Sequence, residues 1–391
     1  MLFKGIILTG TYYAGAHTIA QVLCKPDEDG MPSKFEIVFS VTTRTKCHDD
    51  FNYEYVDDTQ FSSLVENDKL MVEGEYRGGK YGVKIEKYEE VLANSRIPIL
   101  IIPPSLLETC KDNFMSFFID VADEELLTRF QIKEKRTPER DEERDIKTQR
   151  EQDRKVEFEA NYVLKNNEVD NSVALIKLLW EYRGKGGGMP DKIIKSMISC
   201  DMLLEKADAF GVKGASYDLL LGDEYYYGGK IKKLSDSSPF LTIEPYDYAI
   251  VSSKERACMP RDVIAKFGLT VGLFCQGIVL SNGPQIDPGF RGTLFCLLFN
   301  TSNRAVHLKR GTHYATIEFN KLIEAAKPYA GQYQDSEKII EYIPANALQG
   351  AINELKKEVE KLQRESRMMQ NIYLGVVGLM FAMISILLIL R

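Results

Sequence analysis

The feature that most limits what this chain can fold into is an apolar run near its C-terminal end. The 19 residues from Ile372 to Leu390 carry no charged side chain, and Arg391 follows them. At about 1.5 Å per residue, a helix of this length covers about 28 Å, close to the thickness of a bilayer's hydrocarbon. A core helix would be amphipathic, whereas this run is apolar on all faces. We therefore expect residues 372–390 to form one transmembrane helix.

The rest of the sequence suggests how this helix is oriented. Arg364 and Arg367 precede it, in keeping with the positive-inside tendency. The first residues, MLFKGIILTG, are typical of a β-strand rather than of a secretory signal. The seven cysteines include no CxxC pair and are expected to be reduced thiols. We expect a single-pass C-terminal membrane anchor with the soluble domains in the cytosol.

Composition limits the number of domains and the kinds of partner. The 391 residues, 44% of them hydrophobic, are enough for two domains before the anchor. A net charge of −7 argues against nucleic acid as a partner, because binding to phosphates requires a basic surface. The three consecutive glycines in Arg183–Pro190 (RGKGGGMP) are expected to hold neither helix nor strand. We predict domains at 1–183 and 191–343, joined by a linker at 184–190.

A heptad pattern precedes the apolar run and predicts a coiled coil over residues 344–371. Its seam consists of Leu348, Ile352, Leu355, Val359, Leu362, Ser366 and Met369. Such a seam favours self-association, and β-branched residues alternating with leucine favour a parallel dimer, although three heptads do not decide the number of chains. The alternative is a single amphipathic helix packed on its own domain.

The first domain opens with a strand, a glycine-rich turn and a helix. Gly10 and Gly15 bracket the turn, and Thr18 lies in the first turn of the helix. Backbone N–H groups in such a turn suit a phosphate chain. The lysine expected to reach the β- and γ-phosphates is replaced by Ala16, and the next position, which should offer a hydroxyl to magnesium, is His17.

Over residues 3–182 the chain resembles the guanylate kinase family. The segments Ser40–Arg44 with Asn52-Tyr53, and Gly78–Gly82, are similar to that family's two guanylate-binding segments. A helical stretch from Arg140 to Arg150 falls where the family has its lid arginines, and Phe158–Asn166 resembles a late strand. The resemblance implies an α/β P-loop fold and a possible guanine nucleotide ligand. The residues it implies for binding are Gly10, Gly15, Thr18, Arg44, Tyr53, Tyr81, Arg144 and Arg150.

Departures from that family predict that phosphoryl transfer is lost. The central strand ends in Ile99–Pro104, without the acidic residue that would organise metal and substrate. Val72 and Val83 stand where the family contacts guanine and phosphate with Glu and with Ser or Thr. Since phosphoryl transfer depends on positioning and charge neutralisation, we expect no kinase activity. Nucleotide binding could persist, or these residues could serve only the scaffold.

Residues 191–330 read as short strands separated by Gly, Pro and Asn, which predicts an all-β sandwich or jelly roll. This region resembles the dCTP deaminase and dUTPase superfamily. The matching segments are Ala215–Gly222, Pro260–Leu269 (a helix motif in that family), Ile286–Asn300 and Lys309–Ala315. The resemblance implies a homotrimer, a deoxypyrimidine triphosphate ligand, and binding through Asp218, Arg261 and Lys266.

The catalytic machinery of the second domain is also incomplete. The family's acid–base glutamate corresponds to Leu297, and Asp262 would repel a triphosphate at the phosphate-binding position. Asp287 is retained and is our candidate catalytic residue, with turn capping as the alternative. No metal-ligand motif is evident, and Mg²⁺ would enter only with a bound triphosphate. The stretch Thr270–Gln285 is longer than the family's connection and could reshape or fill the pocket.

These observations favour a tail-anchored homo-oligomer with two degenerate nucleotide-enzyme domains, acting as a nucleotide-binding sensor or as a scaffold. One alternative is a membrane-tethered dCTP deaminase or dUTP pyrophosphatase that relies on Asp287. Another is an oligomeric membrane effector whose span responds to the soluble part.

Overall fold

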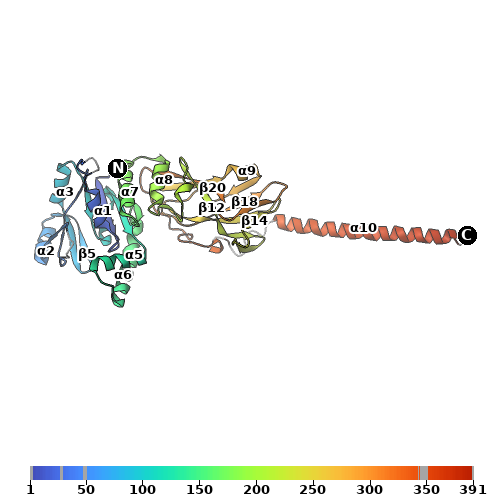
Figure 1. The fold of residues 1–391 in the computed structure, drawn as a ribbon, viewed down its shortest axis with the longest axis horizontal. Coiled ribbons are helices and arrows are strands. Elements are labelled where there is room, and N and C mark those ends of the chain that lie inside the picture. The colour runs from blue at the N-terminus through green and yellow to red at the C-terminus, as the bar shows by residue number, and fades with distance from the viewer. Residues whose placement is uncertain (1–2, 27–29, 47–50, 342, 344–350, 390–391) are drawn as a thin grey trace.

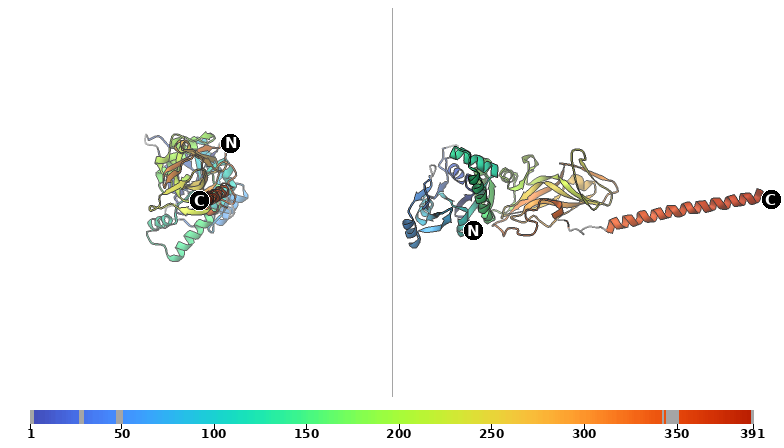
Figure 2. Two further views of the ribbon diagram at one scale, coloured as in Figure 1. Left: turned by 90° about the vertical axis from the view of Figure 1, so that its right-hand side faces the viewer. Right: turned by 90° about the horizontal axis from the view of Figure 1, so that it is seen from below.

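The computed structural model describes residues 3–26, 30–46, 51–341, 343 and 351–389. It consists of two domains in contact and one long helix that extends away from the second domain (Figure 1). The right-hand view of Figure 2, seen from below, shows the same succession.

The first domain is built on a five-stranded parallel sheet with strand order β2-β7-β1-β8-β9. Its strands are β1 (Gly5–Gly10), β2 (Phe35–Ile37), β7 (Ile97–Ile101), β8 (Phe114–Asp120) and β9 (Tyr162–Lys165). All seven residues of β8 are buried, as expected for a parallel strand covered on both faces. The helices are α1 (Ala16–Leu23), α2 (Asp58–Glu66), α3 (Ile85–Ala93), α4 (Leu107–Cys110), α5 (Asp123–Glu134), α6 (Arg140–Asp153) and α7 (Val169–Glu181).

A separate four-stranded sheet forms a lobe of this domain, in the order β4-β3-β6-β5. Its strands are β3 (Ser40–Thr42), β4 (Tyr53–Tyr55), β5 (Leu70–Tyr76) and β6 (Gly79–Lys84). The strand, turn and helix predicted at the start of the chain are confirmed as β1, the loop that follows it, and α1.

The second domain is almost entirely antiparallel β-structure after one short helix, α8 (Asp191–Ile198). Its longer strands are β12 (Ser216–Tyr227), β15 (Tyr248–Cys258), β16 (Val263–Leu269), β18 (Arg291–Asn300) and β20 (His313–Lys321). The shorter ones are β11 (Leu203–Glu205), β13 (Lys230–Lys233), β14 (Phe240–Ile243), β17 (Ile278–Ser281) and β19 (Val306–Lys309). Buried and partly exposed residues alternate along β18, so one face of the sheet lines the core.

Three local predictions are wrong. Gly187–Gly188 forms the short strand β10, which pairs with Asn320 and Lys321 of β20. Strand pairing needs only backbone groups, so glycines can supply it when a neighbouring edge is available. The segment expected to contain a helix motif is strand β16, whose Val263 and Ala265 are fully buried. Conversely, within residues 191–330, for which we expected short strands, Val271–Cys275 forms helix α9.

The hydrophobic core is continuous between the two domains. One cluster of buried residues runs from Ile6 in β1 to Phe319 in β20. Helices α7 and α8, one from each domain, pack against each other at this boundary, where Ile176 and Ile194 are completely buried. The two folds therefore share a packed interface.

After β20 the chain folds back along the second domain. We call residues 322–341 the return segment. The Leu322 N–H donates to the Asp262 carbonyl at 2.6 Å, and the Ala326 N–H donates to the Arg261 carbonyl at 2.8 Å. Further along, the Asp335 N–H donates to the Arg291 carbonyl at 2.8 Å, and Ile339 is buried. The return segment thus covers the backbone of two motifs singled out in the sequence.

The last element is α10 (Ala351–Ile389), a single helix. Its part from Glu358 to Ile384 is long and apolar enough to cross a membrane, and none of the 18-residue window is buried. The predicted domain end near Pro344 and the seam residue Leu348 lie outside the described residues, as do the side chains of Ile352 and Leu355.

Candidate functional site

The phosphate loop of the first domain keeps the backbone shape of an anion site. At Gly10, with φ of 150°, an added Cβ would lie 2.0 Å from the Ile119 carbonyl oxygen. Gly15 caps α1 with φ of 98°, without a side-chain cap and with no acidic residue in the first helical turn. The first N–H groups of an α-helix have no intrahelical partner, so they remain suited to an anion.

Side chains around this loop differ from what phosphoryl transfer requires. Ala16 offers no charge, and Thr18 is exposed. The His17 ring faces the lobe formed by the four-stranded sheet. Its centroid lies 5.8 Å from that of the Phe51 ring and 5.9 Å from that of the Tyr53 ring. The loop itself is held from behind, since Arg129 and Asn166 both donate to the Ala14 carbonyl, at 2.9 and 2.7 Å.

Three predicted binding residues lie together in the lobe that the four-stranded sheet forms in the first domain. The Arg44 guanidinium stacks over the Tyr53 ring at 4.8 Å, and the Tyr53 and Tyr81 rings lie 6.1 Å apart. Burial raises the pKa of Tyr81. Val72 and Val83 are buried in the same hydrophobic cluster as Tyr81, and Tyr53 packs against that cluster. A cavity next to Ser40 and Val83 has no room for a water molecule. The structure therefore packs apolar side chains where the resemblance placed guanine.

Arg144 and Arg150, the two arginines predicted to belong to a lid over the nucleotide, have different environments. Arg144 is exposed on α6. Arg150 makes two hydrogen bonds of 2.9 Å to the Asp120 carboxylate and a third of 2.7 Å to Asp123. Because these contacts use most of its guanidinium donors, Arg150 serves the structure of the domain rather than an open phosphate site.

Asp120, at the end of β8, was missed in the sequence. Its carboxylate is completely buried and also pairs with Lys165 at 2.5 Å and with Arg154 at 3.7 Å. Burial alone would raise its pKa, but the charges of Lys165 and Arg150 outweigh burial and lower it. An acid ending an otherwise apolar run, FMSFFID, was the available signal. A carboxylate neutralised by three cations does not fit Mg²⁺ coordination, so we derive no metal-dependent step here.

A second buried carboxylate connects helix α6 to the lobe formed by the four-stranded sheet. Asp153, the last residue of α6, accepts hydrogen bonds from the Tyr76 hydroxyl at 2.9 Å and from Gln149 at 2.8 Å. Burial raises the pKa of Asp153 to about 6 in spite of these bonds. In the unfolded chain the value is about 3.9. The protonated Asp153 carboxyl group is favoured in the fold, and its contribution to stability is fully present below the unfolded pKa. This contribution is lost as the pH rises through the folded pKa of about 6.

Asp153→Asn should consequently change the pH dependence of stability. The amide cannot ionise but can still accept the Tyr76 hydrogen bond. Relative to the native chain, we expect the variant to gain roughly 1–2 kcal/mol of unfolding free energy between pH 4.5 and pH 7.5. Urea unfolding of both proteins at the two pH values measures this, because other titrating groups cancel in the difference. Parallel pH profiles would show that burial of Asp153 is not costly.

In the second domain, the predicted phosphate-binding motif lies in the interface between the domains. Arg261 donates to the Glu159 carbonyl of the first domain at 3.1 Å and to the Ala326 carbonyl of the return segment at 3.2 Å. The Asp262 carboxylate accepts from the Tyr162 hydroxyl and from Lys321, both at 2.5 Å. Burial and the neighbouring Asp262 raise the pKa of Tyr162. These groups are committed to domain docking.

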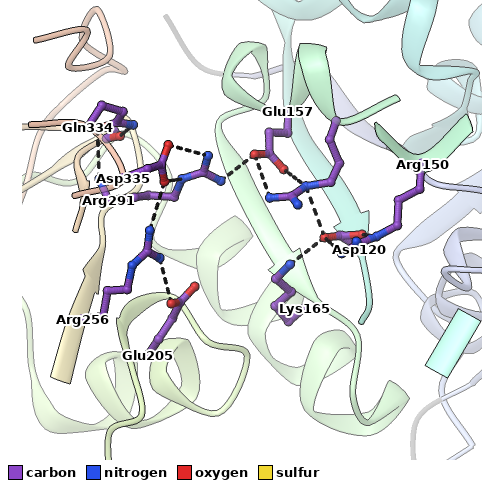
Figure 3. A network of polar contacts seen from close by, with 11 residues as sticks. Asp120, Arg150, Glu157, Lys165, Glu205, Arg256, Arg291, Gln334 and Asp335 are labelled. Atoms are coloured by element: carbon purple, nitrogen blue, oxygen red, sulfur yellow. Dashed lines mark hydrogen bonds and ion pairs between the residues drawn. The ribbon is translucent and has the colours of Figure 1, made fainter. Parts of the chain in front are cut away.

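A charge network extends this interface on both sides (Figure 3). Arg291 donates to the Glu157 carboxylate of the first domain at 2.5 Å and pairs with Asp335 of the return segment at 3.1 Å. Asp335 also accepts from Arg256 at 3.0 Å. The cavity bordered by Glu157, Arg261 and Arg291 measures about 30 Å³, enough for water but not for a nucleotide.

Asp287, the candidate catalytic residue, belongs to a tight turn. Its carbonyl accepts from the Phe290 N–H at 3.2 Å, and its carboxylate accepts from the Gln285 amide at 2.7 Å. The return segment binds the same turn, since the Tyr329 N–H donates to the Pro288 carbonyl at 2.8 Å. Leu297 lies half-buried on β18 and brings no acid–base group to the sheet. The role of the Asp287 side chain, in catalysis or in capping the turn, stays a prediction.

The other two predicted binding residues lie on separate strands. Asp218 accepts a hydrogen bond from the Thr316 hydroxyl at 2.8 Å, and Lys213 lies 3.8 Å from its carboxylate. Lys266 is exposed on β16, in register with Glu318 of β20. Their roles in binding stay predictions. Within the described ranges, no group of three or more His, Cys, Asp or Glu is placed to hold a metal ion.

Comparison with known proteins identifies both folds. The guanylate kinase family profile matches residues 3–182, and the dCTP deaminase-like profile matches residues 189–322. The chain therefore belongs, through its second domain, to the dCTP deaminase-like family, and a guanylate kinase-like domain precedes that domain.

Individual relatives cover one domain each. The dCTP deaminase of Thermococcus kodakarensis is 39% identical over 140 residues, which is 36% of this chain and 89% of the relative. That of Thermococcus gammatolerans is 35% identical over 143 residues, 36% of this chain and 90% of the relative. A solved guanylate kinase from Anaplasma phagocytophilum is 17% identical and covers 46% of this chain and 85% of its own, with a TM-score of 0.35.

Proposed function

We propose that this protein is a membrane-anchored, self-associating scaffold in which two nucleotide-enzyme folds are joined and neither turns over its substrate. The observation that carries the proposal is the position of Arg261 and Asp262. The groups that should meet a triphosphate instead hold the first domain and the return segment. A site whose charged groups have internal partners cannot bind a polyanion without breaking the interface.

The first domain adds a sensing role to this proposal. Its loop retains uncapped N–H groups, and two cations lie over the ring of Tyr12, Arg77 at 5.3 Å and Lys133 at 5.7 Å. This arrangement favours binding of a phosphate-bearing nucleotide. The loop lacks the phosphate-binding lysine, and the Asp120 carboxylate is already paired with three cations. Both features argue against phosphoryl transfer by this domain.

A second candidate is dCTP deaminase or dUTP pyrophosphatase activity, favoured by the 39% identity to a dCTP deaminase and by the retained Asp287. The two functions are separated by incubating the purified full chain in detergent with dCTP, dUTP, dTTP, or ATP plus GMP, each with Mg²⁺. The scaffold proposal expects no uracil nucleotide, pyrophosphate or GDP. Calorimetry with the same ligands then tests sensing, since absence of any binding leaves only a structural role.

Membrane anchoring is the remaining part of the proposal, and the apolar helix supports it. The double variant Met380→Arg/Met383→Arg places two charges near the middle of the span. Each arginine costs about 2.5–3.5 kcal/mol at the centre of an inserting helix. We expect the variant to move from the carbonate-resistant membrane pellet to the soluble fraction, while Met380→Leu/Met383→Leu stays in the pellet. Equal pellet fractions for the two variants would contradict insertion of this helix.

A further inference from the structure

The second domain exposes an apolar surface that nothing in the described chain covers. We define the α9–β17 face as Val271, Phe274, Cys275 and Val279. Val271 is 76% exposed, Phe274 69% and Val279 50%, and Cys275 is also exposed. The surrounding stretch from Thr270 to Ile286 contains no charged residue and no histidine. Isolated exposed apolar residues are ordinary, but a contiguous uncharged group of them marks an interaction site.

One strand of this face, β17, also has an edge that pairs with no other strand of the described chain. β17 pairs with β18 on one side and ends the strand order of its sheet. Its sequence, IVLS, has no charge or proline to prevent edge pairing. Natural proteins usually protect such an edge, because its free N–H and C=O groups recruit other chains. Both the exposed apolar side chains and the unpaired strand edge of this face therefore favour binding of a partner.

The location of the face indicates which partner. Ile278 of β17 pairs with Asn300, at the end of β18 opposite to Arg291, which contacts the first domain. The face thus lies on the side of the second domain from which α10 extends (Figure 1). On α10, the seam residues Val359, Leu362 and Met369 are 47%, 60% and 70% exposed. Two unpartnered apolar surfaces occur on the same side of the molecule.

We propose that the α9–β17 face is a contact surface between copies of this chain. Parallel association along the α10 seam would bring the second domains of neighbouring copies to the same level, with their α10 sides adjacent. A lipid occupant fits less well, because residues 351–371 form about 31 Å of helix between the domain and the apolar run and hold the domain away from the bilayer. This inference rests on the proposed self-association and assigns it a surface.

The test uses the full chain in detergent micelles and two variants. Native mass spectrometry should give an oligomer for the native chain. Phe274→Glu places a charge in the face, and we expect at least a tenfold weaker association. Leu362→Glu does the same in the seam. Both sites are exposed in the single chain, so each variant should keep the native unfolding curve of its soluble domains.

Cys275 supplies an independent readout, with Cys275→Ala to identify its signal. In the native oligomer we expect maleimide to label Cys275 at least tenfold more slowly than in Phe274→Glu. If the native chain is monomeric, self-association itself fails, and this inference with it. If the chain is an oligomer that Leu362→Glu dissociates, while Phe274→Glu has no effect and Cys275 labels at the rate of a free thiol, the seam remains and the α9–β17 face is excluded.

Discussion

Replacing Asp262 by alanine is expected to lower the free energy of unfolding by about 3–5 kcal/mol. The reason is the charge left behind. Lys321 is buried at 8% exposure and donates to Asp262 and to the Tyr162 hydroxyl, at 2.5 and 2.7 Å. Without the carboxylate, an ammonium group stays in the domain interface with only a neutral hydroxyl as partner. Urea unfolding at pH 7 followed by circular dichroism measures the loss.

Two variants bracket this effect. Tyr162→Phe removes one hydroxyl but keeps the ion pair, so it should cost about 1–2 kcal/mol. Asp236→Ala removes a carboxylate that is fully exposed although it lies 3.0 Å from Arg310, and it should leave the free energy of unfolding nearly unchanged. A loss for Asp262→Ala no larger than that for Asp236→Ala would mean that the interface is not a stabilised contact.

Asp120→Ala should be comparably severe, with an expected loss of about 3–5 kcal/mol. The variant leaves Arg150, Arg154 and Lys165 facing one another around a buried position. Because the pKa of Asp120 is lowered in the fold, its contribution is present above the unfolded pKa and is lost as pH falls through the folded value. The difference between native and variant chains should therefore be largest near pH 7 and should shrink in acid.

The matched control lies on the same helix as Arg150. Glu143→Ala removes a carboxylate that pairs with Lys147 at 2.7 Å at the surface, where solvent screens the pair and the loss of stability should be small. Urea titrations of the three proteins at pH 7 and at pH 3, below the pKa of an unfolded aspartate, give the comparison. Equal losses for the two variants, or a loss for Asp120→Ala that grows as pH falls, would contradict the assigned role of Asp120.

Much of the fold was predictable because its signals are local. The apolar run into Gly10 and the glycine at position 15 specify β1, a turn and α1 within a few residues of one another. The short apolar run Leu294–Phe299, which follows the turn residues Pro288-Gly289, specifies a strand, which is β18. The segments predicted wrongly are those in which tertiary pairing overrides local preference. β10 exists only because β20 offers it an edge, and β16 only because it lies along β20 over its whole length.

The site could be predicted only as a set of residue types. The sequence suggested Arg261 as a phosphate-binding residue and Asp262 as unfavourable beside a phosphate, but it gave no sign of their partners. Tyr162 and Lys321 lie 100 and 59 positions from Asp262 along the chain. Nothing in the spacing of one chain pairs residues over such separations. The loss of charge complementarity was visible in the sequence, whereas its use in joining two domains was visible only in the structure.

The central claim is that the second domain has exchanged catalysis for domain docking. Its most direct test is the release of deaminated product from dCTP by the full chain in detergent with Mg²⁺, followed by chromatography, with the Thermococcus kodakarensis dCTP deaminase as the positive control. The account predicts no uracil nucleotide above the rate without protein, both for the native chain and for Asp287→Ala. Product from the native chain that disappears in Asp287→Ala would contradict it.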